Sequence, residues 1–422
     1  MKKLFAFVLC VLLVLVPFAG CNNASAHTLS VGFGKVDVTP MEPVPLGGYT
    51  YERFSEDIRD PLYATCIAFT DENDNTVILF ALEALYCYDV MKFAASDISK
   101  ATGVPFANIM IGTNHNHSAP NFPSESNPSI EAYSKLLREK MLEAAQTALA
   151  DRKPAKMHIT TTYPEKINSI RHYLMSDGSY AGDNFGSFSG GRTVVKPVRD
   201  VDNALQLVKF TREGGKDVIM MNWQGHPTGH GEHHYSIMSY SGKVVESVEQ
   251  RLDCHCMYVL GASGNVNNGS RIPGAQNMGT YENRAAVLAG YVVAATEYQE
   301  VAVGNVQMLR NDVACTPKNG GGNKIDITLN AFSIGDVAFV TAPYEMFCEN
   351  GEAVKAASPF KMTFVSSCSN GRGSYIPSGS TYDYNNKPDE VYEIGKTEYA
   401  PGTGEVLENA FIDMLKQIYE TK

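Results

Sequence analysis

The chain has 422 residues, a formal net charge of -11 and an isoelectric point of about 5.4. Its composition, 44% hydrophobic and 19% charged, is typical of a globular protein with a large buried core. The acidic balance and the lack of any lysine or arginine run argue against nucleic acid as a partner. These bulk features give no indication of the oligomeric state.

The first 26 residues are typical of an export signal with a short tether. Lys2 and Lys3 precede an apolar run over residues 4–18. This run is too short for a comfortable membrane span, but it suits the hydrophobic region of a signal peptide. We therefore expect the mature protein to work outside the cytoplasm.

Two processing sites stay open at the end of this segment. Residues 18–21 resemble a bacterial lipobox, in which Cys21 would be lipidated and would anchor the protein to a bacterial membrane. Residues 24–26 form an Ala-x-Ala site, which would release a soluble secreted protein. We favour the lipoprotein, because two small residues directly precede Cys21. Residues 27–422 are then expected to form a single catalytic domain.

Of the nine cysteines, Cys10 and Cys21 lie in the leader and seven follow it, so at least one thiol is free or pairs with another chain. Cys254 and Cys256 flank a histidine, which is a pattern of metal-ligating residue types. One residue between the cysteines is tighter than the spacing of zinc knuckles, and an apolar run follows at once. We predict that this segment begins a strand and buries its thiols.

Strand-like and helix-like runs alternate along the rest of the chain. We predict strands at 62–70, 76–82, 108–111, 156–162, 204–210, 217–222, 257–260, 306–309, 324–334 and 337–341. We predict helices at 90–102, 129–150, 243–252, 283–300, 346–357 and 405–420. Polar segments at 71–75 and 213–215 are expected to be hairpin turns, and 183–192 a surface loop that covers a site. The pattern predicts an α/β fold with layered mixed β-sheets flanked by helices.

Two histidines, His115 and His117, follow the predicted strand at 108–111. Alternate residues of an extended segment point the same way, so both imidazoles are expected to enter one cleft where the strand ends. Neutral imidazole is the commonest protein ligand for zinc. A single His-x-His pair is also common in ordinary turns, so the interpretation depends on what lies at the other strand ends.

Three further signals also follow predicted strands. His226 comes just after the strand at 217–222, and the proline that follows biases it to an extended conformation. Glu345 follows the strand at 337–341 and precedes the helix at 346–357, whose dipole would favour the ionised carboxylate. Tyr375 lies in a glycine-rich loop. Two imidazoles and a carboxylate are a usual catalytic zinc set, with one position left for water.

A loop that carries His230, His233 and His234 follows His226. These side chains could be additional ligands, but solvent-exposed histidines are the commoner case in such loops.

Taken in chain order, these segments resemble the neutral/alkaline (non-lysosomal) ceramidase family, over its N-terminal catalytic domain. The motifs that carry the resemblance are 32–40 with 47–49, 114–120, 222–228, 261–267, 343–345, and 370–377 with 392–393. The resemblance implies a zinc-dependent hydrolase that uses metal-activated water to cleave the amide bond of an N-acyl lipid such as ceramide. The implied zinc ligands are His115, His226, Glu345 and Tyr375. It also implies that His117 shuttles a proton near the metal-bound water and that Arg171 lies near the substrate carbonyl.

The chain departs from the family at some positions. Asn267 stands where the family often has a catalytic serine, and it could donate its amide to the substrate or the oxyanion. Tyr344 replaces the glycine of the family's Pro-Gly-Glu motif. No counterpart of the family's additional C-terminal immunoglobulin-like domain is expected.

Two other interpretations therefore stay open. One is a zinc esterase or amidase for a smaller, more polar substrate, and the other is a non-enzymatic surface binding protein on the same scaffold. Retention of all four implied ligands argues against a pure binding protein. The expected partner is a small-molecule or lipid substrate, with membrane contact through a lipid anchor. A divalent metal other than zinc would also suit these donors.

Overall fold

The computed structural model describes residues 28–49, 51–122, 128–183, 191–228, 233–269, 278–371, 373–384 and 391–422. The predicted leader, most of the predicted loop at 183–192 and His230 lie outside these residues. Within the described part of the chain, no helix is both long and apolar enough to cross a membrane.

Nine strands form the larger sheet. In spatial order they are β16 (His255–Leu260), β14 (Val218–Trp223), β13 (Leu205–Arg212), β8 (Lys153–Thr162), β1 (Leu29–Asp37), β5 (Tyr63–Asp71), β6 (Thr76–Leu82) and β7 (Ile109–Thr113), with β18 (Gln299–Val301) beside β8. The β14–β16 and β6–β7 pairs are parallel, and the other pairs are antiparallel. The sheet is therefore mixed, as the sequence predicts.

The second sheet has four strands, and helices cover both sheets. Its strands are β19 (Val306–Cys315), β20 (Ile325–Ile334), β21 (Val337–Thr341) and β23 (Met362–Ser366), and β21 and β23 are parallel. The helices are α1 (Tyr88–Thr102), α2 (Pro128–Ala150), α3 (Tyr240–Leu252), α4 (Tyr281–Ala294), α5 (Cys348–Ala357), α6 (Gly379–Asp383), α7 (Tyr392–Lys396) and α8 (Thr403–Glu420), with a 3₁₀ turn η1 at Phe106–Asn108.

Short strand pairs occupy the connections. They are β2 (Pro45–Leu46) with β3 (Arg53–Phe54), β4 (Asp57–Ile58) with β15 (Ser236–Ile237), β9 (Ser169–Ile170) with β17 (Val266–Asn267), β22 (Glu345–Met346) with β24 (Tyr375–Ile376), and β10 (His172–Met175) between β11 (Tyr180–Gly182) and β12 (Val194–Pro197).

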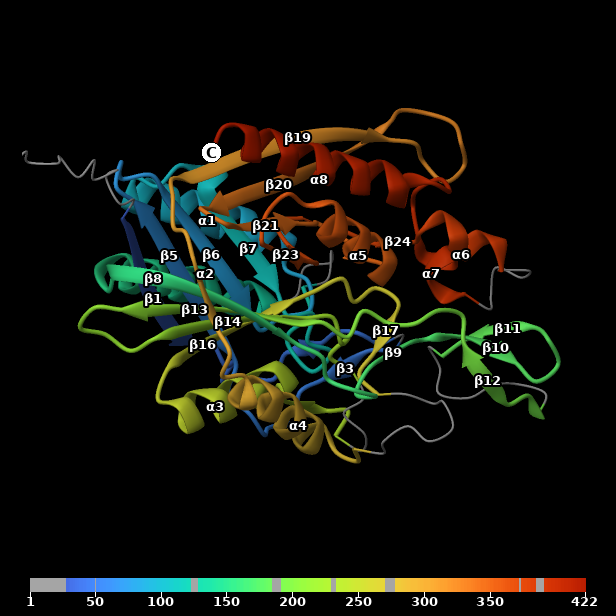
Figure 1. Cartoon of the computed structure of the whole chain (residues 1–422). Helices are drawn as coiled ribbons and strands as arrows, with labels where there is room; N and C mark the ends of the chain where they lie inside the picture. Colours follow the sequence, from blue (N-terminus) through green and yellow to red (C-terminus); the bar gives the residue numbers. More distant parts are fainter. Residues whose placement is uncertain are drawn as a thin grey trace, which may run out of the picture.

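Alternation of side chains along each strand gives the larger sheet two apolar faces. On one face, Ala64 and Cys66 of β5 join a cluster that α1 and α2 cover. This face continues over Ile219 and Met221 of β14, against α3 and α4. The other face packs on the smaller sheet, whose outer face is covered by α5 and α8. The predicted α/β class with layered sheets is confirmed, as a four-layer α/β/β/α arrangement (Figure 1).

Aromatic rings fill the space between the two sheets. Phe332 of β20 stacks on Phe339 of β21, with ring centroids 4.5 Å apart. Phe69 of β5 reaches both of them from the larger sheet, at 6.4 and 6.3 Å. Such pairs each contribute about 0.5–1.5 kcal/mol beyond the burial of their surface. This layer therefore fixes the position of one sheet on the other.

Three parallel strand pairs end at a shared edge of the molecule. Each pair is joined by a helix, in the units β6–α1–β7, β14–α3–β16 and β21–α5–β23. Their carboxyl ends are hydrogen-bonded to one another: Thr113 N–H donates to the Cys368 carbonyl at 3.1 Å, and Ser367 N–H donates to the Leu260 carbonyl at 3.0 Å. Ligand sites in α/β sheets lie outside the carboxyl ends of strands, so this edge is the expected place for one.

Most predicted elements lie where the sequence places them. The strands predicted at 76–82 and 337–341 coincide with β6 and β21, and the two predicted turns join β5 to β6 and β13 to β14. The helix predicted at 283–300 is wrong at its end. It stops at Ala294, because the chain after it becomes β18 and pairs with β8. β1 lies in the middle of the larger sheet, although no strand is predicted at its residues.

The cysteines behave as the sequence predicts. All seven that follow the leader are described, and all seven are free and buried. The segment 254–256 leads into β16, and burial raises the pKa of the Cys254 thiol to about 12 and that of Cys256 well above its usual range. This segment is therefore a buried strand start.

Two glycines let α2 lie directly on β1. A Cβ atom at Gly32 would lie 1.9 Å from the carbonyl oxygen of Ala148, and one at Gly34 would lie 2.2 Å from that of Ala144. Both obstacles are backbone atoms of the helix, so no side-chain rotation could make room. The glycines weaken the strand pattern in the sequence, but they set the distance between this helix and the sheet.

Gly34→Ala is expected to lower the free energy of unfolding by about 2–3 kcal/mol, because the added methyl group has no room. Gly290→Ala in α4 is the matched control, since no described atom outside its own helix lies within 4 Å of the added Cβ. It should raise stability by up to about 1 kcal/mol through helix propensity. Urea unfolding, monitored by the fluorescence of Trp223, measures the stability change in both variants. Equal effects would contradict the close packing of α2 on β1.

Candidate metal centre

The two histidines of the first motif lie on the loop that follows β7. The predicted extended conformation of this segment is wrong, because His115 has a φ of +52°, in the left-handed region. The asparagines that alternate with the histidines anchor the loop to the start of α3. Asn114 Nδ2 donates to Ser241 Oγ at 3.1 Å, and Asn116 Nδ2 donates to the Met238 carbonyl at 2.7 Å. These anchors, and not strand alternation, turn both imidazoles toward the same place.

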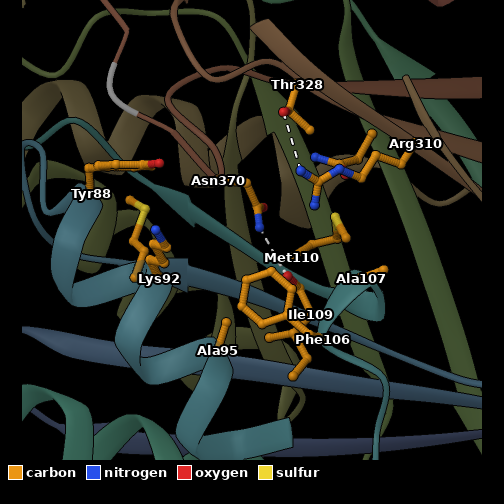
Figure 2. A pocket seen from close by; sticks show the side chains of 12 residues that line it. Tyr88, Lys92, Ala95, Phe106, Ala107, Ile109, Met110, Arg310, Thr328 and Asn370 are labelled. Atoms are coloured by element: carbon orange, nitrogen blue, oxygen red, sulfur yellow. Dashed lines mark hydrogen bonds between the residues drawn. The ribbon is translucent and has the colours of Figure 1, made fainter. Parts of the chain in front are cut away.

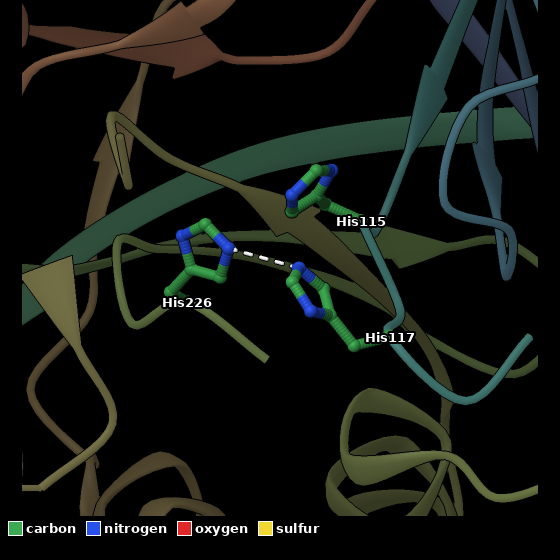
Figure 3. Close-up of side chains that lie close together, drawn as sticks. All are labelled: His115, His117 and His226. Carbon is green, nitrogen blue, oxygen red and sulfur yellow. Dashed lines mark hydrogen bonds between the residues drawn. The ribbon is translucent and has the colours of Figure 1, made fainter. Parts of the chain in front are cut away.

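Figure 3 shows that His115, His117 and His226 face one another, although His226 follows a different strand, β14. The three ring centroids are separated by 4.9, 4.7 and 5.0 Å. The Nε2 atoms of His117 and His226 lie 3.1 Å apart, and one ring nitrogen from each of the three lies within 4.8 Å of the others. All three rings are buried. The structure thus brings together the histidines that the sequence selected.

Glu345 completes this group from β22, the short strand that follows β21 of the smaller sheet. Its Oε2 lies 3.4 Å from His115 Nε2 and 3.9 Å from His226 Nε2. Its Oε1 accepts a hydrogen bond from the hydroxyl of Tyr86. The Oε2 atom is buried and accepts no hydrogen bond of good geometry among the described residues, although a hydrogen bond from Tyr375 to this carboxyl group helps to lower its pKa. A buried carboxylate oxygen without a well-placed donor is costly unless a cation lies beside it.

The expectation that a helix dipole favours the ionised form of Glu345 is wrong. Glu345 belongs to β22, and α5 begins only at Cys348. Burial raises the pKa of Glu345 to about 7, although Tyr86 and Arg171 oppose this shift. The cost of desolvating the carboxylate is therefore larger than any stabilisation of its charge by the N-terminus of α5.

The remaining ring nitrogens are held by the surrounding chain. His226 Nδ1 lies 3.1 Å from the Ser263 carbonyl, and His115 Nδ1 lies 3.7 Å from the Cys368 sulfur. Burial lowers the pKa of His115 to about 3 and that of His226 well below its usual range, and the cationic Arg171 adds to both shifts. Both imidazoles are therefore neutral near neutral pH, with the Nε2 atoms turned toward Glu345. Metal-binding histidines have this arrangement.

The donor atoms have the spacing that a zinc ion requires. Ligands at about 2.0–2.1 Å from a tetrahedral centre lie about 3.3 Å from one another. The 3.4 and 3.9 Å separations at Glu345 and the 3.1 Å separation between His117 and His226 fit this size. The residues present therefore fit a divalent metal. Three of its ligands would be His115, His226 and Glu345. The fourth ligand would be either Tyr375 or His117.

Tyr375 lies beside Glu345 because β22 and β24 pair in parallel with these two residues in register. Burial and the nearby Glu345 carboxylate raise the pKa of the Tyr375 hydroxyl well above its usual range. The phenol is therefore protonated until a cation binds beside it, and metal binding at this site would release a proton.

Arg171, which lies between β9 and β10, is a buried cation at the edge of the site. Its guanidinium carbon lies 5.5 Å from the centre of the Tyr375 ring. Its Nε donates to Glu393 Oε1 at 2.6 Å, and its Nη2 donates to the Gly264 carbonyl at 2.5 Å. Glu393 Oε2 lies 3.0 Å from His172 Nε2. Burial opposes ionisation of Glu393, but Arg171 and His172 outweigh it and lower the Glu393 pKa to about 2.

A second buried arginine fixes the other side of the His117 loop. Arg53 Nη2 donates to the His117 carbonyl at 2.7 Å, and other donors of the same guanidinium reach two further loop carbonyls. The guanidinium lies 4.4 Å from the centre of the Tyr49 ring, whose edge contacts His117. Gly48 has a φ of +90°, and a Cβ there would lie 2.3 Å from the His117 ring. This position therefore requires glycine.

Asn267 adjoins the site through its backbone. It pairs with Ser169 between β17 and β9, and it forms an isolated bridge to His226. Its Nδ2 donates to Asp183 Oδ2 at 3.3 Å. Asn267 therefore lies beside the second histidine motif, with a carboxylate partner, Asp183, that the sequence pattern does not indicate.

The two described histidines of the loop that follows His226 lie outside the group of candidate metal ligands. His233 and His234 are described, and neither belongs to the buried group of three histidines. The ring of His234 contacts Tyr49, with centroids 5.4 Å apart.

Four residues that shape the site have no predicted role: Tyr86, Arg53, Glu393 and His172. Glu393 lies in one of the motifs that carry the family resemblance, and His172 follows Arg171 directly, so both have a signal in the sequence. Tyr86 and Arg53 have none, because only the fold brings them to the histidines.

Comparisons with known proteins support the fold. No protein-family model matches the sequence, and no curated protein does. A solved structure described as a ceramidase complexed with C2 matches with a TM-score of 0.72 and 14% identity, over 93% of this chain and 76% of that chain. The structure of neutral ceramidase from Pseudomonas aeruginosa matches with a TM-score of 0.72 and 15% identity, over 93% and 75%. The fold implied by the sequence resemblance is confirmed, and at these identities the likeness shows the fold alone.

Glu393→Gln is expected to lower the free energy of unfolding by about 3–5 kcal/mol, because it leaves the buried Arg171 without its counter-charge. The depressed pKa gives stability that is present above the ordinary carboxyl value of 4.5 and is lost as the pH falls towards about 2. Chemical denaturation across this range measures both effects. The double variant with Arg171→Met should recover part of the loss. If Glu393→Gln lost as much stability as the wild type when the pH falls, the low pKa assigned to Glu393 would be contradicted.

Tyr375→Phe is expected to weaken zinc binding at least about tenfold, because it removes the fourth donor. His117→Ala should leave zinc affinity within about threefold, because this residue is expected to move protons and not to bind the metal. Competition with a chelating dye measures both affinities, and Tyr163→Phe, at an exposed tyrosine on another surface, is the control. The reverse order of effects would assign the fourth donor to His117.

Proposed function

We propose that this protein is a zinc-dependent hydrolase that cleaves the amide bond of an N-acyl lipid such as ceramide. The observation that carries the proposal is the meeting of two neutral imidazoles with the buried carboxylate of Glu345, at the carboxyl ends of three strand pairs. The fold that holds these donors is shared with ceramidase structures, which supports the choice of reaction. Retention of this buried carboxylate beside two imidazoles argues against a pure binding protein.

The residues that would hold zinc are His115, His226, Glu345 and Tyr375. The chemistry that a bound zinc ion supplies is polarisation of a carbonyl oxygen and a water molecule whose pKa falls to about 7. Because the two imidazoles are neutral and buried, their lone pairs are available near neutral pH.

Three further side chains have roles in the proposed reaction. Arg171, held as a cation by Glu393, stabilises the negative charge that develops on the substrate carbonyl oxygen. His117 accepts a proton at Nε2 from the attacking water and passes it to the nitrogen of the leaving amine. The amide of Asn267 donates a hydrogen bond to the substrate, where the family often has a serine.

A lipid substrate is favoured by exposed apolar side chains next to the His117 loop. Tyr51, Phe54, Ile58 and Tyr235 each expose 45–48% of their surface. Tyr51 contacts Tyr49, which in turn contacts His117. The backbone of the Tyr235 segment pairs with residue 56. Exposed apolar side chains that gather in one patch mark surfaces that bind membranes or other apolar partners, and we infer that these four side chains form such a surface. The predicted lipid anchor at Cys21 would hold this surface near a bilayer.

The central test is hydrolysis of a fluorescent short-chain N-acylsphingosine, together with the metal content of the purified protein. Wild type and the His158→Ala control, at a histidine on β8, should hold one zinc ion and release the amine. His115→Ala should lose the zinc and at least about a thousandfold of kcat/KM, because it loses a metal ligand. A chelator should abolish the wild-type activity and zinc should restore it. Wild type that binds no zinc when zinc is supplied would overturn the proposal.

The same assay separates a lipid from a smaller substrate. Phe54→Ser should lower kcat/KM several-fold for a long-chain N-acylsphingosine in vesicles and leave the short-chain substrate unaffected. Val406→Ser, at an exposed residue of α8, is the matched control. Zinc binding with hydrolysis of polar esters or amides only would instead establish the alternative hydrolase.

A further inference from the structure

A second pocket lies at the far end of β7 from the histidines. It has a volume of about 210 Å³ and is enclosed by α1, η1, the start of β7 and strands β19 and β20 (Figure 2). Ile109 and Met110 line it, whereas His115 and His117 follow the opposite end of the same strand. The pocket is therefore separate from the candidate metal centre.

The wall of this pocket on the α1 and β7 side is apolar. Met91 and Ala95 from α1 meet Ile109 and Met110 from β7, and the four side chains are almost fully buried. Phe106 of η1 stands at the rim and is 43% exposed. A ligand that enters the pocket would therefore bury an apolar group against this wall.

Two cations face the same space from opposite sides. Figure 2 shows Lys92 on α1 and Arg310 on β19, with the pocket between them. Lys92 has no ion pair or hydrogen bond among the described residues. The partners of Arg310 are distant: Thr328 Oγ1 at 3.4 Å and the exposed Asp312 at 3.9 Å. No acidic residue lines the pocket, although acidic residues outnumber basic ones, 46 to 35, in the whole chain.

Polar side chains of the lining leave room for an anion. The Tyr88 hydroxyl donates no hydrogen bond within the described part of the chain. Asn330 is buried, and its Nδ2 makes one long contact, to Thr341 Oγ1 at 3.4 Å. The amide of Asn370 is already committed, because it bonds the backbone of Ile109. Tyr88 and Asn330 therefore add neutral donors to the two charges.

We propose that this pocket binds a compact organic carboxylate, with its apolar body against Met91, Ala95 and Ile109 and its carboxylate between Arg310 and Lys92. The planar fork of arginine suits the two oxygens of a carboxylate. The volume equals that of about seven water molecules, which suits a short acyl chain and is too small for a long one. An inorganic phosphate would satisfy the charges but would leave the apolar wall in contact with water.

The proposal is tested by isothermal titration of the full mature protein with hexanoate, hexanamide and inorganic phosphate. Hexanoate should bind, and hexanamide, which has the same shape without the charge, should bind at least about tenfold more weakly. Arg310→Gln and Lys92→Gln should each weaken hexanoate at least about tenfold. Lys100→Gln is the matched control, because Lys100 is an exposed lysine on the same helix that does not line the pocket.

A substitution that fills the pocket gives an independent readout. Ala107→Trp adds a ring at an exposed lining residue of η1 and should abolish hexanoate binding without removing a charge. Circular dichroism and thermal unfolding would show that each variant is folded. Equal binding of hexanoate and hexanamide, binding of phosphate as tight as that of hexanoate, or binding unchanged in Arg310→Gln and Ala107→Trp would overturn the proposal. Because the titration measures no hydrolysis, failure here is distinguishable from failure of the proposed reaction.

Discussion

The two sheets are held face to face by a core that includes a layer of phenylalanine side chains, and the position of the candidate metal centre depends on that contact. His115 and His226 come from the larger sheet, whereas Glu345 and Tyr375 follow strands of the smaller one. A shift of one sheet on the other by a few ångströms would separate the carboxylate from both imidazoles. Close-packed interiors resist such shifts, so the core between the sheets keeps the donor atoms at ligand spacing.

Burial also governs the chemistry of the donors. It keeps His115 and His226 neutral and raises the pKa of Glu345 to about 7, so a cation beside this carboxylate would offset the cost of its buried charge. Arg171 is different, because Glu393 compensates its charge within the protein. The site therefore combines two neutral imidazoles and a carboxylate, which suit a metal ion, with one permanent cation, which suits a developing oxyanion.

The strand β7 connects the two ligand sites of the molecule. The loop at its carboxyl end carries His115 and His117, and its first residues form part of the wall of the carboxylate pocket. Asn370 forms hydrogen bonds with the backbone of Ile109 and Ile111. It lies in the loop that leads to Tyr375. One short strand and one loop thus contribute to both the candidate metal centre and the carboxylate pocket.

The sequence by itself determined the layered α/β class, most strand and helix positions, and the histidines and Glu345 at strand ends, because periodicity and residue type are local properties of the chain. It did not determine how these residues meet. The left-handed conformation at His115, the hydroxyl of Tyr86 on Glu345 and the ion pair of Arg171 with Glu393 join segments that are far apart in sequence. Only tertiary packing decided them, since burial and through-space charge depend on neighbours that no local pattern specifies.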